Sequence, residues 1–154
     1  MGDGTADGRL RLEARTFVAS KVPPALRRHI LPFDWDVRRV WRLDTPARPI
    51  PRAELDYLLD LPLWSSKPKS GMLFDLAPRT VLEDAQAAPH QYRRVNQADT
   101  SYPIDMLEFD GARWILDGVH RLARLYLEGA EEVSLRLHPA ASIPLIRLRP
   151  GGAQ

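Results

Sequence analysis

Residues 102–137, YPIDMLEFDGARWILDGVHRLARLYLEGAEEVSLRL, are the stretch that decides the fold of this chain. Their first part, residues 102–109, is rich in apolar side chains and ends at Asp110-Gly111, the strongest short-range signal for a β-hairpin turn. Residues 113–116 then return as a second strand. The sequence therefore predicts a two-stranded hairpin at the centre of the fold.

An amphipathic helix is predicted directly after this hairpin. Asp117-Gly118 breaks the second strand, and the apolar residues that follow have the i, i+3, i+4, i+7, i+8 spacing of one helix face: Val119, Leu122, Ala123, Tyr126 and Leu127. Gly129 suits the left-handed conformation that ends many helices. Residues 132–137 alternate between polar and apolar side chains and predict a further strand.

The first turn of this helix combines features that suit an anion. Its N–H groups have no partners inside the helix, and the helix dipole places partial positive charge there. Gly118 lets another group approach closely, and His120 and Arg121 are expected to point away from the apolar face. Such a set of groups suits a phosphate or a carboxylate. The alternative, which composition alone favours, is a simple strand-to-helix turn with a solvated Arg121.

Residues 114–122, WILDGVHRL, followed by Gly129 and a strand, resemble the D-G-x-H-R element of the ParB/sulfiredoxin superfamily. Residues 102–104, YPI, resemble the Pro-Ile pair that opens the preceding strand in that family. The resemblance covers residues 102–137 and is weak upstream of them. It implies an α+β fold class, with a small mixed β-sheet flanked by helices, as in ParB/sulfiredoxin-like domains.

Members of the family that carry close versions of this element include ADP- or ATP-dependent free-serine kinases and many uncharacterised ParB-like proteins. In such proteins the glycine turn, the histidine and the arginine contact nucleotide phosphates. The resemblance implies ATP or ADP as the cofactor, with magnesium as the ion that accompanies it. The cofactor-binding role then falls on four consecutive residues: Gly118, Val119, His120 and Arg121.

Candidates for catalysis are carboxylates and the imidazole of the turn. Asp117 is expected to orient the turn or to position His120 by a hydrogen bond. Glu54 is a candidate base by rough position only, because the serine kinases carry a catalytic glutamate near their first helix. Asp99 is the other carboxylate that would activate an acceptor.

Residues 63–71, LWSSKPKSG, form a predicted loop that carries Lys67 and Lys69. These lysines would bind a phosphate if the loop closed over it. A plain surface loop is the simpler interpretation.

Two branches of the superfamily do not fit this sequence. Sulfiredoxins have a catalytic cysteine just before the His-Arg pair, where this chain has Val119, and the chain contains no cysteine. Sulfinic-acid reduction is therefore excluded, because no thiolate exists to attack. The chromosome-partitioning members carry an arginine-rich element and a downstream helix-turn-helix domain, for which we expect no room here.

Composition and charge limit the partners. The 154 residues, 44% hydrophobic and 27% charged, are typical of one soluble globular domain. A net charge of +2 argues against direct DNA binding. The lack of cysteine fits a cytoplasmic protein, and we expect no membrane partner because no apolar run is long enough to span a bilayer. The oligomeric state is not determined by these features.

Further elements and boundaries follow from turn residues and periodicity. Residues 35–43 predict a strand, and Ile50-Pro51 is expected to open the first helix. Residues 81–95 predict one or two short helices broken by Pro89, interpreted as a substrate-specific insertion. Residues 143–148 predict an edge strand.

A single domain is expected at residues 9–148. Residues 1–8 are expected to be a disordered leader, and residues 149–154 a frayed tail. No spacing of histidines predicts a metal site.

These observations predict a nucleotide- or phosphate-binding ParB-like domain that acts as a phosphotransferase or nucleotide hydrolase on a small-molecule acceptor. The alternative is a non-catalytic nucleotide sensor, or a module associated with a DNA complex. Neither the acceptor substrate nor the nucleotide base follows from the sequence.

Overall fold

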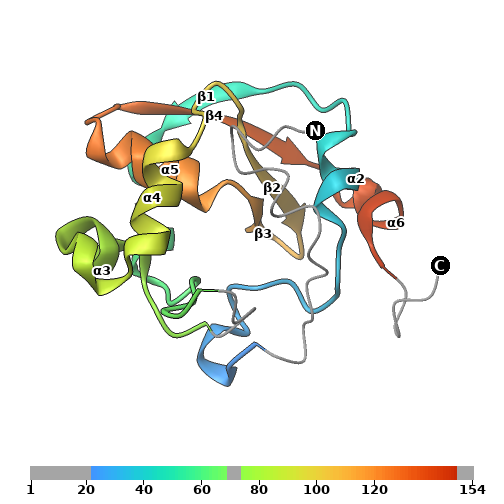
Figure 1. Ribbon diagram of the computed structural model, residues 1–154. Coiled ribbons are helices and arrows are strands. Elements are labelled where there is room, and N and C mark those ends of the chain that lie inside the picture. Colours follow the sequence, from blue (N-terminus) through green and yellow to red (C-terminus); the bar gives the residue numbers. More distant parts are fainter. Residues whose placement is uncertain (1–21, 69–73, 149–154) are drawn as a thin grey trace.

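The computed structural model describes residues 22–68 and 74–148, in which a four-stranded mixed sheet is flanked by helices (Figure 1). The strand order is β1-β4-β2-β3, with bounds Arg48–Pro51 for β1, Ile104–Phe109 for β2, Ala112–Asp117 for β3 and Glu132–His138 for β4. Strand β4 runs antiparallel to β1 and parallel to β2, and β2 runs antiparallel to β3. This architecture confirms the predicted α+β class, while the ParB/sulfiredoxin assignment stays a prediction. The expected leader and tail lie outside the described residues.

The central hairpin and the helix after it form as predicted. Asp110 and Gly111 join β2 to β3 with φ values of 52° and 77°, the left-handed conformations of a type I′ turn. Helix α5, Val119–Leu127, follows β3, and Gly129 ends it with a φ of 73°. Strand β4 then returns beside β2, so β3 and α5 together form the crossover between two parallel strands.

The remaining helices are short. They are η3 Pro24–Leu26, α2 Val37–Trp41, η4 Arg52–Asp60, α3 Pro78–Glu83, η5 Ala85–Ala87, α4 Pro89–Gln97, η6 Ala140–Ser142 and α6 Ile143–Ile146. Prolines begin α3 and α4, where the missing N–H costs nothing. These two helices confirm the prediction for residues 81–95. In Figure 1, α3, α4 and α5 lie together, and α2 and α6 lie together on the other side of the view.

Two predicted strands are helices instead. Within residues 35–43, the Asp36 carboxylate caps a helical turn by accepting the Arg38 N–H at 2.9 Å, and Val37 and Val40 are buried one turn apart. In the segment 143–148, residues Ile143–Ile146 form α6. A short bridge between the two segments remains, since Trp35 pairs with Arg147. Short apolar segments have no decisive periodicity, and here tertiary packing of α2 against α6 selects the helix.

The first helix also starts later than predicted. Ile50 and Pro51 belong to β1, where Ile50 lies opposite Val133 of β4. The helix that follows, η4, is a 3₁₀-helix from Arg52 to Asp60. Its three leucines, Leu55, Leu58 and Leu59, are buried. Ile50 and Pro51, which were expected to open the helix, therefore form part of a strand because they pair with β4.

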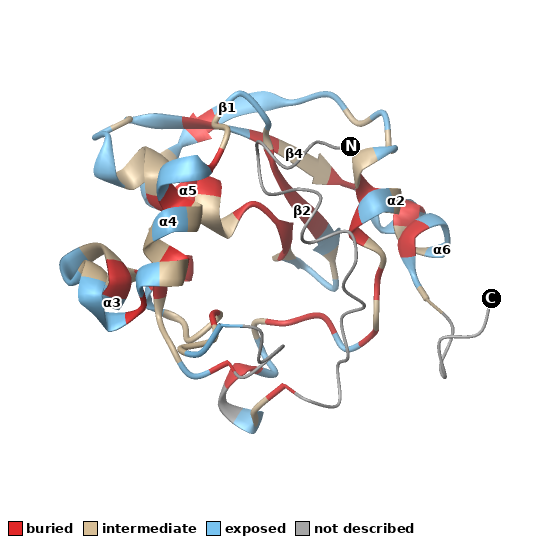
Figure 2. Ribbon diagram, in the orientation of Figure 1, coloured by how far each residue is buried: buried red, intermediate tan, exposed pale blue. Residues whose placement is uncertain are grey.

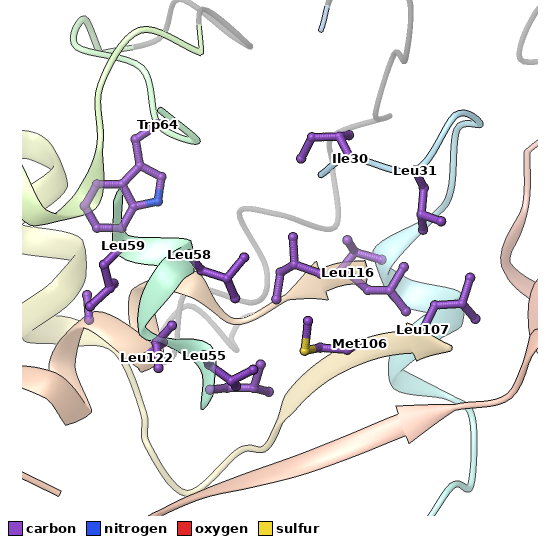
Figure 3. Close-up of a cluster of buried hydrophobic side chains, with 14 of the residues drawn as sticks. Ile30, Leu31, Leu55, Leu58, Leu59, Trp64, Met106, Leu107, Leu116 and Leu122 are labelled. Atoms are coloured by element: carbon purple, nitrogen blue, oxygen red, sulfur yellow. The ribbon is translucent and has the colours of Figure 1, made fainter. Parts of the chain in front are cut away.

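The hydrophobic core lies between the sheet and the helices η4 and α5. Figure 2 shows buried residues along β2 and on α5. In Figure 3, leucines of η4 and Leu122 of α5 lie on one side of the cluster, and Met106 and Leu107 of β2 lie across from them. Met106, Leu107 and Leu122 have no exposed surface. In the ranges that the structure describes, no helix is both long and apolar enough to cross a bilayer.

Candidate functional site

The turn between β3 and α5 requires glycine for two reasons. Gly118 has a φ of 119°, which side chains rarely adopt. A Cβ atom at this position would lie 3.1 Å from Arg121 Nη2 and 3.2 Å from the Cα of Ile104. Gly118 was predicted to let a ligand approach closely, but the groups that approach it in the structure are Arg121 and Ile104 of the protein itself.

An ion pair between Asp117 and Arg121 lies beneath this turn. Arg121 Nη2 donates to Asp117 Oδ2 at 3.1 Å, and the indole of Trp41 donates to the same oxygen at 2.8 Å. Only 3% of the Arg121 side chain and 0% of the Asp117 side chain are exposed. The expected outward orientation of Arg121 is wrong, and so is its solvated alternative. Helix α5 packs against α3, α4 and η4 as well as β2, so little of its surface remains open.

This ion pair leaves polar atoms without partners. Asp117 Oδ1 and Arg121 Nε are buried, and neither has a hydrogen-bond partner among the described residues. The start of α5 is also uncapped by any side chain, and its first turn contains no acidic residue. The Leu122 N–H donates to the Gly118 carbonyl at 2.9 Å. Donors and acceptors therefore remain unused at one end of α5.

His120 is half-buried and is held from two sides. Its ring stacks on Trp64, with centroids 4.2 Å apart and planes at 11°. Its Nε2 lies 2.8 Å from Gln91 Oε1 of α4. Because Gln91 Nε2 donates to the Ser65 carbonyl at 3.0 Å, Oε1 is the acceptor and His120 Nε2 carries the proton. Asp117 thus does not position His120. Gln91 and Trp64 do.

The predicted loop does approach this turn. Trp64 opens it, and the Ser65 carbonyl also lies 3.2 Å from His90 Nε2, so the loop is fastened to α4. Lys67 is exposed, and Ser66 and Asp75 close the loop by hydrogen bonds of 2.6 and 2.8 Å. Lys69 lies outside the described residues. The phosphate-binding roles of both lysines stay predictions.

Asp99 lies within electrostatic reach of the same turn. Its Oδ1 accepts the Ser101 hydroxyl at 2.6 Å and the Ser101 N–H at 2.9 Å. These bonds, and to a smaller degree the positive charge of Arg121, hold the pKa of Asp99 below its ordinary value of 3.8. Asp99 is therefore an ionised carboxylate close to the start of α5.

Glu54 does not belong to this group of residues. It lies on η4, where its Oε1 accepts a hydrogen bond from Arg113 Nη2 at 2.9 Å. Arg113 precedes Asp117 by four residues on β3, a separation of about 13 Å at the rise of a β-strand. The structure therefore does not bring Glu54 together with Asp117 and His120. Val119, the remaining predicted contact, is half-buried and packs against the core.

A second buried aspartate, Asp105, is bound by two side chains. Its Oδ1 accepts from Arg136 Nε at 2.7 Å and from His138 Nε2 at 2.9 Å. Arg136 also donates to two backbone carbonyls of the segment 40–45, at 2.6 and 2.9 Å. His138 Nδ1 accepts from the Thr45 hydroxyl at 2.7 Å. This network fastens the segment between α2 and β1 to the sheet.

Three residues that shape the turn were not assigned to it from the sequence. Trp41 lies in a segment predicted as a strand, and Gln91 lies in the segment interpreted as an insertion. Trp64 had one signal, its position at the start of the lysine-containing loop. Their contacts join parts of the chain that are 29 to 76 residues apart, so no local pattern reports them.

Metal ligation can be judged for the part of the chain that is described. Residues 22–68 and 74–148 contain no group of three or more His, Cys, Asp or Glu side chains that could hold a metal ion. Magnesium carried by a nucleotide needs only one or two carboxylates. Its involvement therefore stays a prediction.

Comparisons with known proteins give no family for this chain. No protein-family model matches it, and neither a curated protein nor a solved structure matches it. The resemblance to the ParB/sulfiredoxin superfamily therefore depends on the motif residues alone.

Proposed function

We propose that the start of α5 binds the phosphate groups of ATP or ADP, and that the protein transfers or hydrolyses a phosphoryl group with a small-molecule acceptor. The observation that carries the proposal is the buried Asp117–Arg121 pair, in which Arg121 Nε and Asp117 Oδ1 have no partner among the described residues. A buried polar atom without a hydrogen bond costs about 1–3 kcal/mol. A phosphate oxygen could accept from Arg121 Nε, whereas Asp117 Oδ1 would need a donor, such as a hydroxyl group of the nucleotide or of the acceptor.

The residues fit a phosphate in part. The amides of the first turn of α5 have no side-chain cap, and a phosphate there would lie beside the half-buried ring of His120. Contact with His120 Nε2 requires that nitrogen to leave Gln91 Oε1. Arg121 is almost fully buried, and its charge is paired with that of Asp117. A direct contact with its guanidinium requires Arg121 to move away from Asp117.

The acceptor would be activated by Asp99 and not by Glu54. Asp99 is the ionised carboxylate near Arg121, whereas Glu54 is paired with Arg113 at the far end of β3. The same carboxylate suits a magnesium ion bound to the nucleotide. A nucleotide as ligand also fits a cytoplasmic location.

Calorimetric titration of the full chain with ADP and ATP, each with and without magnesium, tests this proposal. We expect His120→Ala to weaken nucleotide binding by about tenfold, because the phosphate loses the Nε2–H that would exchange Gln91 Oε1 for a charged acceptor. Arg124→Ala is the matched control. Arg124 lies on the same helix one turn after His120, and its guanidinium group is held by Glu128 at 2.9 Å and by the Asn96 carbonyl. The nucleotide affinity of the Arg124→Ala variant should stay within about twofold of that of the unchanged protein.

Turnover then separates an enzyme from a sensor. Release of phosphate, or its transfer to a hydroxyl-bearing acceptor, identifies the enzyme, and binding without turnover identifies the sensor. The proposal fails if neither nucleotide binds, or if both substitutions change the affinity equally.

A further inference from the structure

A cavity of about 300 Å³ lies at the opposite end of β3 from the turn at Gly118. Three separate parts of the chain bound it: the residues after η3, helix η4, and the start of β3. Its volume is at the lower end of the range of about 300–1,000 Å³ for small-molecule sites. The side chains that matter for its chemistry are Arg28, His29, Glu54, Tyr57, Arg113 and Trp114.

Arg113 has unused bonding capacity in this cavity. Its Nη2 donates to Glu54 Oε1 at 2.9 Å, so only one of its two terminal nitrogens is used in this ion pair. Nη1 is buried and has no hydrogen-bond partner in the described ranges. A guanidinium group presents its N–H groups as a planar fork that matches a carboxylate. An anion that reaches Nη1 would complete the bonds of Arg113.

The charge of the cavity favours a monoanion. Arg28 is exposed and, within the described part of the chain, makes no side-chain hydrogen bond or ion pair. The guanidinium groups of Arg28 and Arg113 face a single carboxylate, that of Glu54. One positive charge is therefore unbalanced when His29 is neutral. A dianion such as a phosphate monoester would leave the cavity with a net negative charge beside Glu54.

Aromatic rings form the rest of the wall. The rings of His29 and Tyr57 are tilted against each other with centroids 6.5 Å apart. The indole of Trp114 is fixed because its Nε1 donates to the Phe109 carbonyl at 2.8 Å. Burial raises the pKa of Tyr57, an effect that the charge of Arg113 opposes, so the phenol remains a hydrogen-bond donor at neutral pH. These rings suit a flat apolar body.

We propose that this cavity binds a small aromatic carboxylate, with its carboxylate on Arg113 and Arg28 and its ring against Tyr57 and Trp114. This cavity is separate from the turn at Gly118. Arg113 lies four residues from Asp117 on β3, and no cavity-lining residue belongs to α5. The proposal therefore stands or falls independently of nucleotide binding.

Titration of the ¹⁵N-labelled full chain with benzoate, followed by two-dimensional NMR, tests the proposal. We expect saturable shifts of the Arg113, Trp114 and Tyr57 amides and none at His120. Benzyl alcohol, which has no charge, should bind at least about tenfold more weakly than benzoate, because it cannot pair with the guanidinium groups. Phenyl phosphate should also bind more weakly at a pH where it is a dianion.

Variants separate the site from general attraction of anions. Arg113→Gln and Arg28→Gln should each weaken benzoate binding by about tenfold, whereas the control Arg124→Gln should leave it unchanged. Glu54→Gln should tighten benzoate binding, because it removes the negative charge of the cavity. Shifts spread over the whole surface, or equal affinity in Arg113→Gln, Arg28→Gln and Arg124→Gln, would overturn the proposal. Phenyl phosphate binding more tightly than benzoate would assign the cavity to phosphates instead.

Discussion

Two buried aspartates face each other across the β2–β3 ladder, Asp105 on one strand and Asp117 on the other. Each is paired with one arginine, which removes the repulsion expected of like charges in opposed positions. Around Asp105, all three side-chain nitrogens of Arg136 donate hydrogen bonds. Around Asp117, one carboxylate oxygen and the Nε of Arg121 have no partner among the described residues.

The difference between these two pairs separates structure from candidate function. In the Asp105 network every side-chain nitrogen of Arg136 already donates a hydrogen bond, and these bonds specify how the chain is arranged. An incomplete network at a helix start keeps buried groups that a ligand can satisfy. We therefore interpret the Asp105 network as an anchor and the Asp117 pair as part of the proposed binding site.

The largest expected effect comes from breaking the anchor. Arg136→Met leaves the Asp105 carboxylate without its cation and also leaves two backbone carbonyls of the segment 40–45 without their donor. We expect the free energy of unfolding to fall by about 3–5 kcal/mol, the usual loss when one partner of a buried ion pair is removed. Denaturant unfolding followed by circular dichroism measures it. A loss below about 1 kcal/mol would show that the network does not anchor the fold.

A smaller effect on stability is expected at the incomplete pair when both charges are removed together. Asp117→Asn with Arg121→Met keeps an acceptor for Trp41 and leaves no unpaired charge. Replacing a buried ion pair in this way is often neutral, so we expect a change within about 1 kcal/mol together with loss of nucleotide binding.

The same double change at the anchor, Asp105→Asn with Arg136→Met, is the matched control. It leaves the backbone carbonyls unpaired and should cost at least about 2 kcal/mol. If the Asp117 variant is as destabilised as this control, the comparison between an anchor and a binding site is wrong. Retained nucleotide binding in the Asp117 variant would remove the proposed function.

The smallest effect is a dependence on pH. The Ser101 hydrogen bonds, and less strongly the charge of Arg121, hold the pKa of folded Asp99 below 3.8. The resulting stabilisation is fully present above that value and is lost as the pH falls through the lower folded pKa. Asp99→Asn should therefore make the unfolding free energy decline less steeply below about pH 4. Asp60 and Asp75 also have lowered pKa values, so the decline should be reduced and not abolished. Identical pH profiles in the two proteins would contradict this assignment.

Part of this structure was predictable because its signals are local. The Asp110-Gly111 turn has the positive φ values that its residue types favour, and α5 has the bounds that its apolar spacing and the flanking glycines predict. The predicted strands at residues 35–43 and 143–148 were wrong because their local signals are weak. Their apolar side chains carry no decisive period, and the packing of α2 against α6 selects a helix.

The candidate site was predictable in its position but not in its arrangement. Gly118, His120 and Arg121 do meet at one turn. Their partners come from elsewhere in the chain, as Gln91 and Trp64 show for His120. Glu54 was assigned to the site by rough position, and the structure places it in the cavity at the start of β3.

The sequence by itself determined the hairpin, the helix that follows it and the concentration of an imidazole and a guanidinium at the start of that helix, because turn preference and helical periodicity act between neighbouring residues. Tertiary structure alone decided that Arg121 turns inward to Asp117, that Arg136 and His138 both donate to Asp105, and that one buried nitrogen of Arg113 has no partner among the described residues. Hydrogen bonding and burial depend on which distant segments cover a side chain, and Arg136 and the carbonyl of Val40, for example, are 96 residues apart.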